Sequence, residues 1–351
     1  MSLTGRGKAV ITVGSVVALL GVAVGAMALT GHAPAAITGA IHKVIGNTSP
    51  PLCPLTGLPA PGGTIPARPA LAVKIENLPE ARPQAGLDKA DIVYEEPVEG
   101  GITRFISVFH CREAGRVGPV RSGRTTDPDI LRQFGKPLLG YSGGANLVHK
   151  AIQHSPVVDL SDTNQPAIYT RDPSRPEPHN LYTTTAKLWA AGKKVAKTDT
   201  APPRPVFTYA DTYSGSAKKV SSVHLPFSSY SDVYWKWNRS AGAWLRSHGT
   251  VPHTLDDGNQ VQATNVVVQQ VKVVPGTIID PAGNPSPEVD VVGSVKAWIF
   301  RDATMIVGHW ERKKLSDTTV FTTKAGDVIP LAPGTTWVEL LPSTIHLSTS
   351  K

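Results

Sequence analysis

Charged side chains that could bind or transform a substrate are densest in one stretch of about thirty residues. The stretch contains Glu95, Glu96, Glu99, Arg104, Arg116, Arg121 and Arg124. Arginine binds carboxylate or phosphate groups through two parallel hydrogen bonds. Arg121 and Arg124 also precede Asp127 and Pro128, a pair typical of a helix start, and the amino terminus of a helix attracts anions. We therefore expect an anionic ligand site here. The expected ligand-binding residues are Arg104, Arg121, Arg124, His179 and Asn180.

The same cluster also has a purely structural interpretation. Charged side chains rarely lie near a core strand unless they are paired. The three glutamates of the stretch could therefore neutralise its arginines, above all Arg104, which falls in an apolar run. The sequence leaves both interpretations open.

A second candidate for chemistry is Ser142, in the segment Gly140–Gly144 that matches G-x-S-x-G. In α/β-hydrolases this pattern exposes a nucleophilic serine between a strand and a helix, with an acid and then a histidine later in the chain. Asp159 or Asp162 and then His179 follow in that order. The spacing is tight for such a fold, so a glycine-rich turn is the alternative.

The remaining motifs give little support for other chemistry. A carboxylate such as Glu96 could act as a general acid or base, so the weak catalytic candidates are Ser142, His179 and Glu96. The segment His253–Gly258 could hold a cation but is also an ordinary turn. The sequence has no HExxH, GxxxxGK[ST] or GxGxxG pattern. We expect neither a metal nor a cofactor.

The amino terminus predicts a membrane attachment. Arg6 and Lys8 precede Ala9–Leu29, a run of 21 uncharged residues, which is long enough to span a bilayer as a helix. Residues 1–29 are thus a single-pass anchor, or a signal peptide cut near Ala28, and the rest of the chain lies outside the cytoplasm. Residues 30–51 form a flexible tether.

This location bears on the two cysteines, Cys53 and Cys111. Disulfides persist in extracytoplasmic compartments. We expect the two residues to form a disulfide, and two separately buried thiols are the alternative.

The elements that position these side chains alternate between strands and helices in the first half. Apolar runs predict strands over 70–76, 91–97, 102–111 and 137–141, and helices over 127–134, 145–154 and 183–194. The run 102–111 is apolar on both faces, so it should be central in its sheet and form a hairpin with 91–97. We assign residues 52–200 to a mixed α/β domain with a central sheet.

A polar segment with three prolines, 197–205, marks a change of pattern. Strands are expected at 206–209, 220–225, 231–237, 244–248, 264–274, 294–300, 305–311 and 337–341. No helix is expected, so residues 206–350 should form a mainly antiparallel β domain and the fold class is α+β. Six of the seven tryptophans lie in this half, and we expect most of them in its core.

A series of short motifs links the chain to a known family. They are Pro54–Pro59, Arg68–Asn77, Ala81–Leu87, Ala90–Glu95, Glu99–Phe105, Gly118–Arg124, Pro178–Tyr182 and Asn265–Val268. In this order they resemble the YerB-like family, bacterial envelope proteins with a domain of unknown function, over about residues 52–345. The resemblance implies the two-domain architecture and a place outside the membrane, but no reaction. Family members are often lipoproteins, and this chain departs from them by having a membrane-spanning start instead of a lipidated cysteine.

Charge and location together favour a binding protein over an enzyme. The net charge of +8 suits anionic surroundings, and an exported protein is not expected to bind nucleic acid. The leading hypothesis is a membrane-tethered protein that binds a wall glycan, polymer or peptide. The alternatives are an envelope hydrolase or transferase that uses Ser142 or a carboxylate, and a scaffold for membrane-protein partners.

Overall fold

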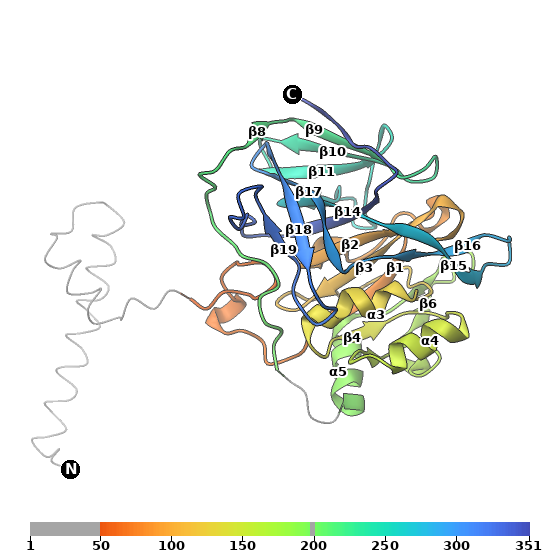
Figure 1. The fold of residues 1–351 in the computed structure, drawn as a ribbon. Coiled ribbons are helices and arrows are strands. Elements are labelled where there is room, and N and C mark those ends of the chain that lie inside the picture. Colours follow the sequence, from red (N-terminus) through yellow and green to blue (C-terminus); the bar gives the residue numbers. More distant parts are fainter. Residues whose placement is uncertain (1–49, 197–200) are drawn as a thin grey trace, which may run out of the picture. The chain divides into compact units, whose positions relative to one another are not determined.

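An eleven-stranded mixed sheet contains strands from both halves of the sequence (Figure 1). Its order is β19-β18-β17-β14-β20-β2-β3-β1-β4-β5, with β8 paired to β18. The structure is a computed structural model that describes residues 50–196 and 201–351. Residues 51–351 form one unit. The predicted anchor and nearly all of the predicted tether lie outside the described residues.

Five strands of the large sheet come from the first half of the chain. They are β1 (Leu71–Glu76), β2 (Ile92–Pro97), β3 (Thr103–Phe109), β4 (Leu138–Gly140) and β5 (Val158–Asp159). β3 is antiparallel to both β1 and β2, whereas β4 and β5 are parallel to β1. The carboxyl ends of β1, β2, β4 and β5 therefore lie at the same end of the sheet. Every residue of β3 is buried, which confirms the central strand and its hairpin with β2.

The second half of the chain supplies the other strands of this sheet. They are β8 (Lys218–Lys219), β14 (Asn265–Val271), β17 (Gly293–Arg301), β18 (Thr304–Arg312), β19 (Val320–Thr322) and β20 (Thr336–Pro342). β20 is parallel to both of its neighbours, β14 and β2. Thr336 pairs in register with Ile92 on one side and with Asn265 on the other. One late strand thus joins the two halves of the chain.

A smaller sheet packs against one face of the large sheet. Its strands are β9 (Ser222–Pro226), β10 (Asp232–Asn238), β11 (Ala243–His248), β12 (Val251–Pro252), β13 (Gln262–Ala263) and β21 (Ser348–Ser350). Edge-to-face contacts join the sheets, with the ring centroids of Trp235 and Trp337 5.2 Å apart and those of Trp244 and Phe300 5.7 Å apart. These three tryptophans and Trp310 are buried, as expected for core residues.

Three α-helices flank the sheet in the described chain, together with short 3-10 turns. The helices are α3 (Thr126–Leu131), α4 (Asn146–Gln153) and α5 (Thr185–Ala196). The 3-10 turns are Pro61–Gly63, Pro79–Ala81, Leu87–Lys89, Glu99–Gly101, Arg132–Phe134 and Pro166–Ile168. α5 shares a core with the face of the sheet that carries Phe105, on the same side as the smaller sheet. α3 and α4 share a core with the opposite face, which carries Ile106.

Two small hairpins complete the fold. β6 (Thr170–Arg171) pairs with β7 (Leu181–Tyr182), and β15 (Val273–Ile279) pairs with β16 (Pro285–Val289). The second hairpin extends beyond the large sheet in Figure 1. We had expected one strand over 264–274, but the chain leaves the large sheet at Lys272 and enters this hairpin.

Two other local predictions differ from the structure. Residues 206–209 are no strand, because Tyr209 makes only an isolated bridge to Leu331. The helix expected at Asp127 begins at Thr126 instead, and its N-cap residue makes no side-chain capping bond. Asp127 does not cap the helix because its carboxylate binds Lys74 and the backbone N–H of Arg124.

The predicted disulfide is present. Cys53 and Cys111 are bonded, with their Cα atoms 6.1 Å apart. The bond ties the start of the described chain to the segment after β3. Over residues 50–196 and 201–351, no helix is long and apolar enough to cross a membrane.

Candidate functional site

One row of the large sheet brings three charged side chains onto the same face. Arg104 of β3 pairs in register with Glu76 of β1 on one side and with Glu96 of β2 on the other. Residues directly opposite each other in an antiparallel pair share a face of the sheet. This is the face covered by α3, so all three side chains are enclosed between the sheet and the helix side of the fold.

The deepest part of the site is a buried charge triad. Lys74 Nζ contacts Glu96 Oε1 and lies 2.6 Å from Asp127 Oδ1, and all three side chains are buried. Burial raises the pKa of Glu96 to about 7, against the opposing effect of Lys74, and the Asp127 carboxylate raises it further. One cation thus faces two carboxyl groups, of which Glu96 is the one that readily takes up a proton.

Closer to the surface, Glu76 holds two of the predicted ligand-binding residues. Its Oε1 accepts a hydrogen bond from Arg121 Nε at 2.9 Å, and its Oε2 lies 2.9 Å from His179 Nδ1. The Glu76 carboxylate is buried, whereas the Arg121 side chain is 25% exposed. The two terminal nitrogens of Arg121 donate to no group among the described residues, so they are available to a ligand.

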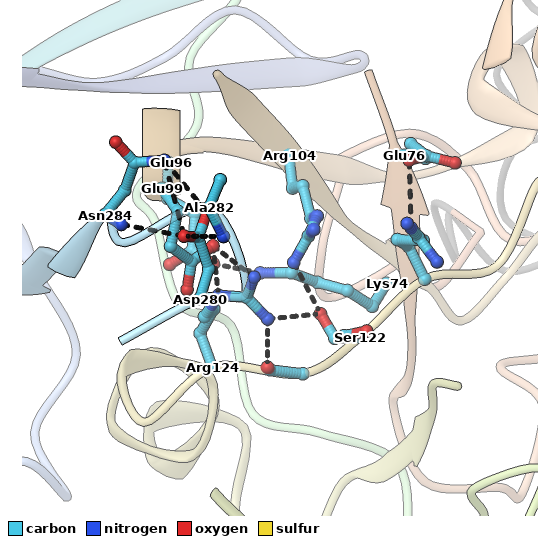
Figure 2. Close-up of polar contacts among 12 residues, drawn as sticks. Lys74, Glu76, Glu96, Glu99, Arg104, Ser122, Arg124, Asp280, Ala282 and Asn284 are labelled. Atoms are coloured by element: carbon cyan, nitrogen blue, oxygen red, sulfur yellow. Dashed lines mark hydrogen bonds and ion pairs between the residues drawn. The ribbon is translucent and has the colours of Figure 1, made fainter. Parts of the chain in front are cut away.

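The side chain of Arg124 is bound by other groups of the protein. Its Nε lies 3.0 Å from Glu99 Oε2, its Nη2 contacts the same oxygen, and its Nη1 donates to the carbonyl of Gly123 at 2.7 Å. Burial alone would raise the pKa of Glu99, but the hydrogen bonds and charge of Arg124 hold it below its usual value. Figure 2 shows Asn284, from the β15–β16 hairpin, beside this pair.

Arg104 is the unusual member of the set. It is only 8% exposed, yet no carboxylate lies within ion-pair distance among the residues that the structure describes. Its one hydrogen bond runs from Nη1 to the carbonyl of Ser122 at 3.2 Å, and the side chain lies beside Arg124 (Figure 2). Burial, and then the charge of Arg124, lower the pKa of Arg104 to about 9. Arg104 is therefore a buried cation without a described ion-pair partner, and the more distant carboxylates of Glu99 and Glu76 only partly offset burial and the charge of Arg124.

The structure brings together only part of the predicted site. Arg104, Arg121 and Arg124 are joined through the segment 121–124, and we call these three residues the arginine site. His179 reaches it through Glu76. Asn180 does not, because its amide bonds the carbonyls of Asp172 and Arg175 and the side chain of Arg171, all within its own loop.

Ser142 lies beside the arginine site without a histidine partner. Its Oγ donates to Asp162 Oδ2 at 2.6 Å, and its backbone N–H donates to the carbonyl of Arg121 at 3.0 Å. His179 is engaged by Glu76 instead. The order serine, aspartate, histidine is therefore present in the sequence, but the described contacts do not form a catalytic triad.

The segment His253–Gly258, which could have held a cation but is also typical of a turn, makes other contacts. His253 lies 2.8 Å from both Gln84 Oε1 and Arg246 Nη1, and Asp257 accepts bonds from Asn259. In the described part of the chain, no group of three His, Cys, Asp or Glu side chains is arranged to hold a metal ion.

A second buried polar network lies on the opposite face, between the two sheets. Arg246 Nη2 lies 2.7 Å from Glu95 Oε2, and neither side chain is exposed. Arg246 Nη1 lies 2.8 Å from His248 Nε2 as well as from His253 Nδ1. Both histidines therefore act as neutral acceptors, and burial followed by the charge of Arg246 lowers the pKa of His253 well below its usual value.

Glu339 of β20 belongs to the same network. It pairs in register with Glu95, and its Oε1 accepts a hydrogen bond from Trp235 Nε1 at 2.7 Å. Burial, and then the charge of Glu95, raise the pKa of Glu339. These effects favour the protonated form of Glu339 beside the Glu95–Arg246 pair.

Comparison with known proteins agrees with the fold. A family model described as the N-terminal domain of a protein of unknown function (DUF3048) matches residues 55–199, and the model of its C-terminal domain matches residues 223–338. The chain belongs to this family. The expected YerB-like membership is thus confirmed.

Two comparisons find similarity to a protein named YerB. A Bacillus subtilis protein named "Putative lipoprotein YerB" is 29% identical over 307 residues, which cover 85% of this chain and 88% of the relative. The crystal structure of YerB from the same organism has a TM-score of 0.74 at 24% identity, over 85% of this chain and 99% of that one. This YerB-like chain therefore has the α+β fold that the sequence predicts.

Sequence reasoning missed several partners in this YerB-like site. We expected Glu95, Glu96 or Glu99 to neutralise the arginines, and Glu99 does bind Arg124. Glu76, the partner of Arg121, was not considered, although Lys74 and Glu76 interrupt an apolar strand at alternate positions. That alternation is the signal that could have identified both as buried, same-face charges.

The raised pKa of Glu96 gives a test of the buried triad. The folded protein holds this proton more tightly than the unfolded chain, so stability is lost as the pH rises through the folded pKa. Between about pH 5 and 8, the wild type should lose about 2 kcal/mol of unfolding free energy relative to Glu96→Gln. Urea denaturation across this pH range measures the difference, in which contributions from other titrating groups cancel.

The matched control is Glu80→Gln, which removes an exposed carboxylate. Its stability should follow the wild type at every pH. A constant difference between wild type and Glu96→Gln would show that Glu96 does not exchange a proton in this range.

Proposed function

We propose that this protein is a membrane-tethered extracytoplasmic protein that binds an anionic ligand of the cell envelope at the arginine site. The ligand class is a wall glycan, an anionic polymer or a peptide. The observation that carries the proposal is Arg104, a buried guanidinium with no described carboxylate within ion-pair distance. An unpaired buried charge is costly unless a partner completes it. An anionic ligand would supply that partner.

The surroundings of Arg104 support this assignment. Arg121 offers its free terminal nitrogens at the surface, while Arg124 is fixed by Glu99. The site lies where β1 ends, and in open α/β sheets ligands bind outside the carboxyl ends of strands. We therefore assign ligand contact to Arg104 and Arg121, and positioning to Arg124 and to Glu76, which holds His179 beside Arg121.

The tether is part of the proposal. The relative that carries the name lipoprotein points to membrane attachment, and the apolar segment Ala9–Leu29 is the corresponding element of this chain. The contacts of Ser142 favour no hydrolase or transferase, and no contact favours a scaffold. We therefore propose neither of these alternatives.

Arg104→Met separates a ligand role from a structural role. The change keeps the apolar stem but removes the unpaired charge, so stability should be unchanged or higher. Binding to isolated bacterial cell walls should weaken at least tenfold, because a hydrogen bond to a charged group contributes about 1.5–3 kcal/mol. Co-sedimentation of the full chain with walls measures binding, and thermal unfolding measures stability.

Arg239→Met is the matched control, because Arg239 is exposed in a turn and loses the same charge. It should change neither quantity by much. The proposal fails if Arg104→Met binds walls as Arg239→Met does. A lower stability with unchanged binding would instead assign Arg104 to the architecture of the core.

A further inference from the structure

A loop beside the arginine site leads into a helix whose N-cap residue makes no side-chain capping bond. The chain leaves β4, runs through Ser142–Ala145, which we call the glycine loop, and enters α4 at Asn146. Ala145 is the N-cap residue and makes no side-chain capping bond. The backbone N–H groups from Gly143 to Leu147 donate to no acceptor among the described residues. Five successive backbone donors at or just before the positive end of the helix dipole therefore have no described acceptor.

The glycine loop is fastened to the arginine site by backbone hydrogen bonds. Ser142 N–H donates to the carbonyl of Arg121 at 3.0 Å, and Gly123 N–H donates to the carbonyl of Gly143 at 3.1 Å. A Cβ atom added at Gly143 would meet Ser122 Oγ at 3.7 Å. Arg104, more than nine-tenths buried, donates its only described hydrogen bond to that same Ser122. Gly143 of the glycine loop and the Arg104 guanidinium thus both lie next to Ser122.

We propose that the anion held at this site is a phosphoryl group, a phosphate monoester or diester, seated between the glycine loop and the arginines Arg104 and Arg121. This inference rests on the proposed function. Backbone N–H groups at helix amino termini bind phosphate. The tetrahedral oxygens of a phosphoryl group can accept bonds from the loop on one side and from the guanidinium groups on the other. A carboxylate has two coplanar oxygens and cannot engage both sides as fully.

Nearby carboxylates leave one of the three arginines without an ion-pair partner. Glu76 is paired with Arg121, Glu99 with Arg124 and Asp127 with Lys74. Asp162 accepts from Ser142 Oγ in the glycine loop. It lies at the Ser142 end of the loop, whereas the free donors begin at Gly143.

Asn146 allows one donor to be removed without disturbing the helix. It is the first residue of α4, where proline is well tolerated. The preceding Ala145 has φ −67° and ψ 159°, the extended conformation that a residue before proline prefers. Asn146→Pro therefore deletes a backbone N–H, whereas Asn146→Ala changes the side chain and keeps it.

The test is to titrate the full chain with inorganic phosphate and, as the carboxylate probe, with acetate. Calorimetry measures the binding in each titration. We expect wild type and Asn146→Ala to bind phosphate equally and more tightly than acetate. Asn146→Pro should bind phosphate about tenfold more weakly, and Arg104→Met more weakly still. Thermal unfolding of both Asn146 variants should match the wild type.

The outcomes separate this inference from the proposed function. Equal phosphate binding by Asn146→Pro and Asn146→Ala, or acetate bound as tightly as phosphate, overturns the phosphoryl assignment. The arginine site still stands in that case if Arg104→Met weakens binding to cell walls. If Arg104→Met binds phosphate and cell walls as the wild type does, both the phosphoryl assignment and the proposed function are overturned.

Discussion

Replacement of Arg246 by methionine is expected to lower the free energy of unfolding by about 3–5 kcal/mol, because it breaks a fully buried ion pair. The change removes the cation 2.7 Å from Glu95 Oε2. The Glu95 carboxylate then keeps Thr103, whose Oγ1 lies 2.6 Å from Oε1, and more weakly Asn77, neither of which carries a charge. Glu339 lies beside it and brings no positive charge. Urea denaturation followed by tryptophan fluorescence suits the measurement, since Trp235 and Trp337 pack in this region.

Two further variants identify the cause of that loss. Arg239→Met removes an exposed arginine and should cost less than about 1 kcal/mol. Combining Glu95→Gln with Arg246→Met removes the uncompensated charge, and it should recover a large part of the loss. If Arg246→Met is as stable as Arg239→Met, the two sheets do not depend on this pair.

The double replacement Cys53→Ala and Cys111→Ala is expected to cost roughly 4 kcal/mol on the chain-entropy model, because the disulfide closes a loop with a sequence separation of 58. Both cysteines are buried in a small apolar cluster with Ala60, so alanine keeps the character of the site. Thermal unfolding and urea denaturation of the oxidised wild type and the double variant measure the loss.

A reducing agent provides the internal control for the disulfide. It should lower the stability of the wild type to about that of the double variant and leave the variant unchanged. Equal stability of oxidised wild type and double variant would mean that the unfolded chain is already compact across this loop.

Local features of the sequence predicted the local features of the fold. β1, β2 and β3 were recognisable as apolar runs, and the glycines at 100 and 101 indicated the turn of the β2–β3 hairpin. Cys53 and Cys111 could be paired because the chain contains no other cysteine. These inferences depend on neighbouring residues or on simple counts.

The ion pairs between residues far apart in the sequence could not be predicted in the same way. Arg121 binds Glu76, 45 positions earlier, and Arg246 binds Glu95, 151 positions earlier. Alternation identifies which face a charged residue occupies, but not which distant residue meets it there. The predicted boundary at 197–205 reflects a real change in composition, yet the large sheet continues from β2 to β20.

The position of β20 also governs how the nascent chain can fold. β2 ends at Pro97, and β20, which must lie between β2 and β14, begins at Thr336. Ribosomes deliver the chain from its amino end, so both neighbouring strands emerge long before the strand that separates them. Non-local pairing of this kind slows folding, and the unpaired edges are open to association with other chains meanwhile. The large sheet can therefore be completed only after the chain has reached Thr336, and until then the facing edges of β2 and β14 lack the strand that pairs with both.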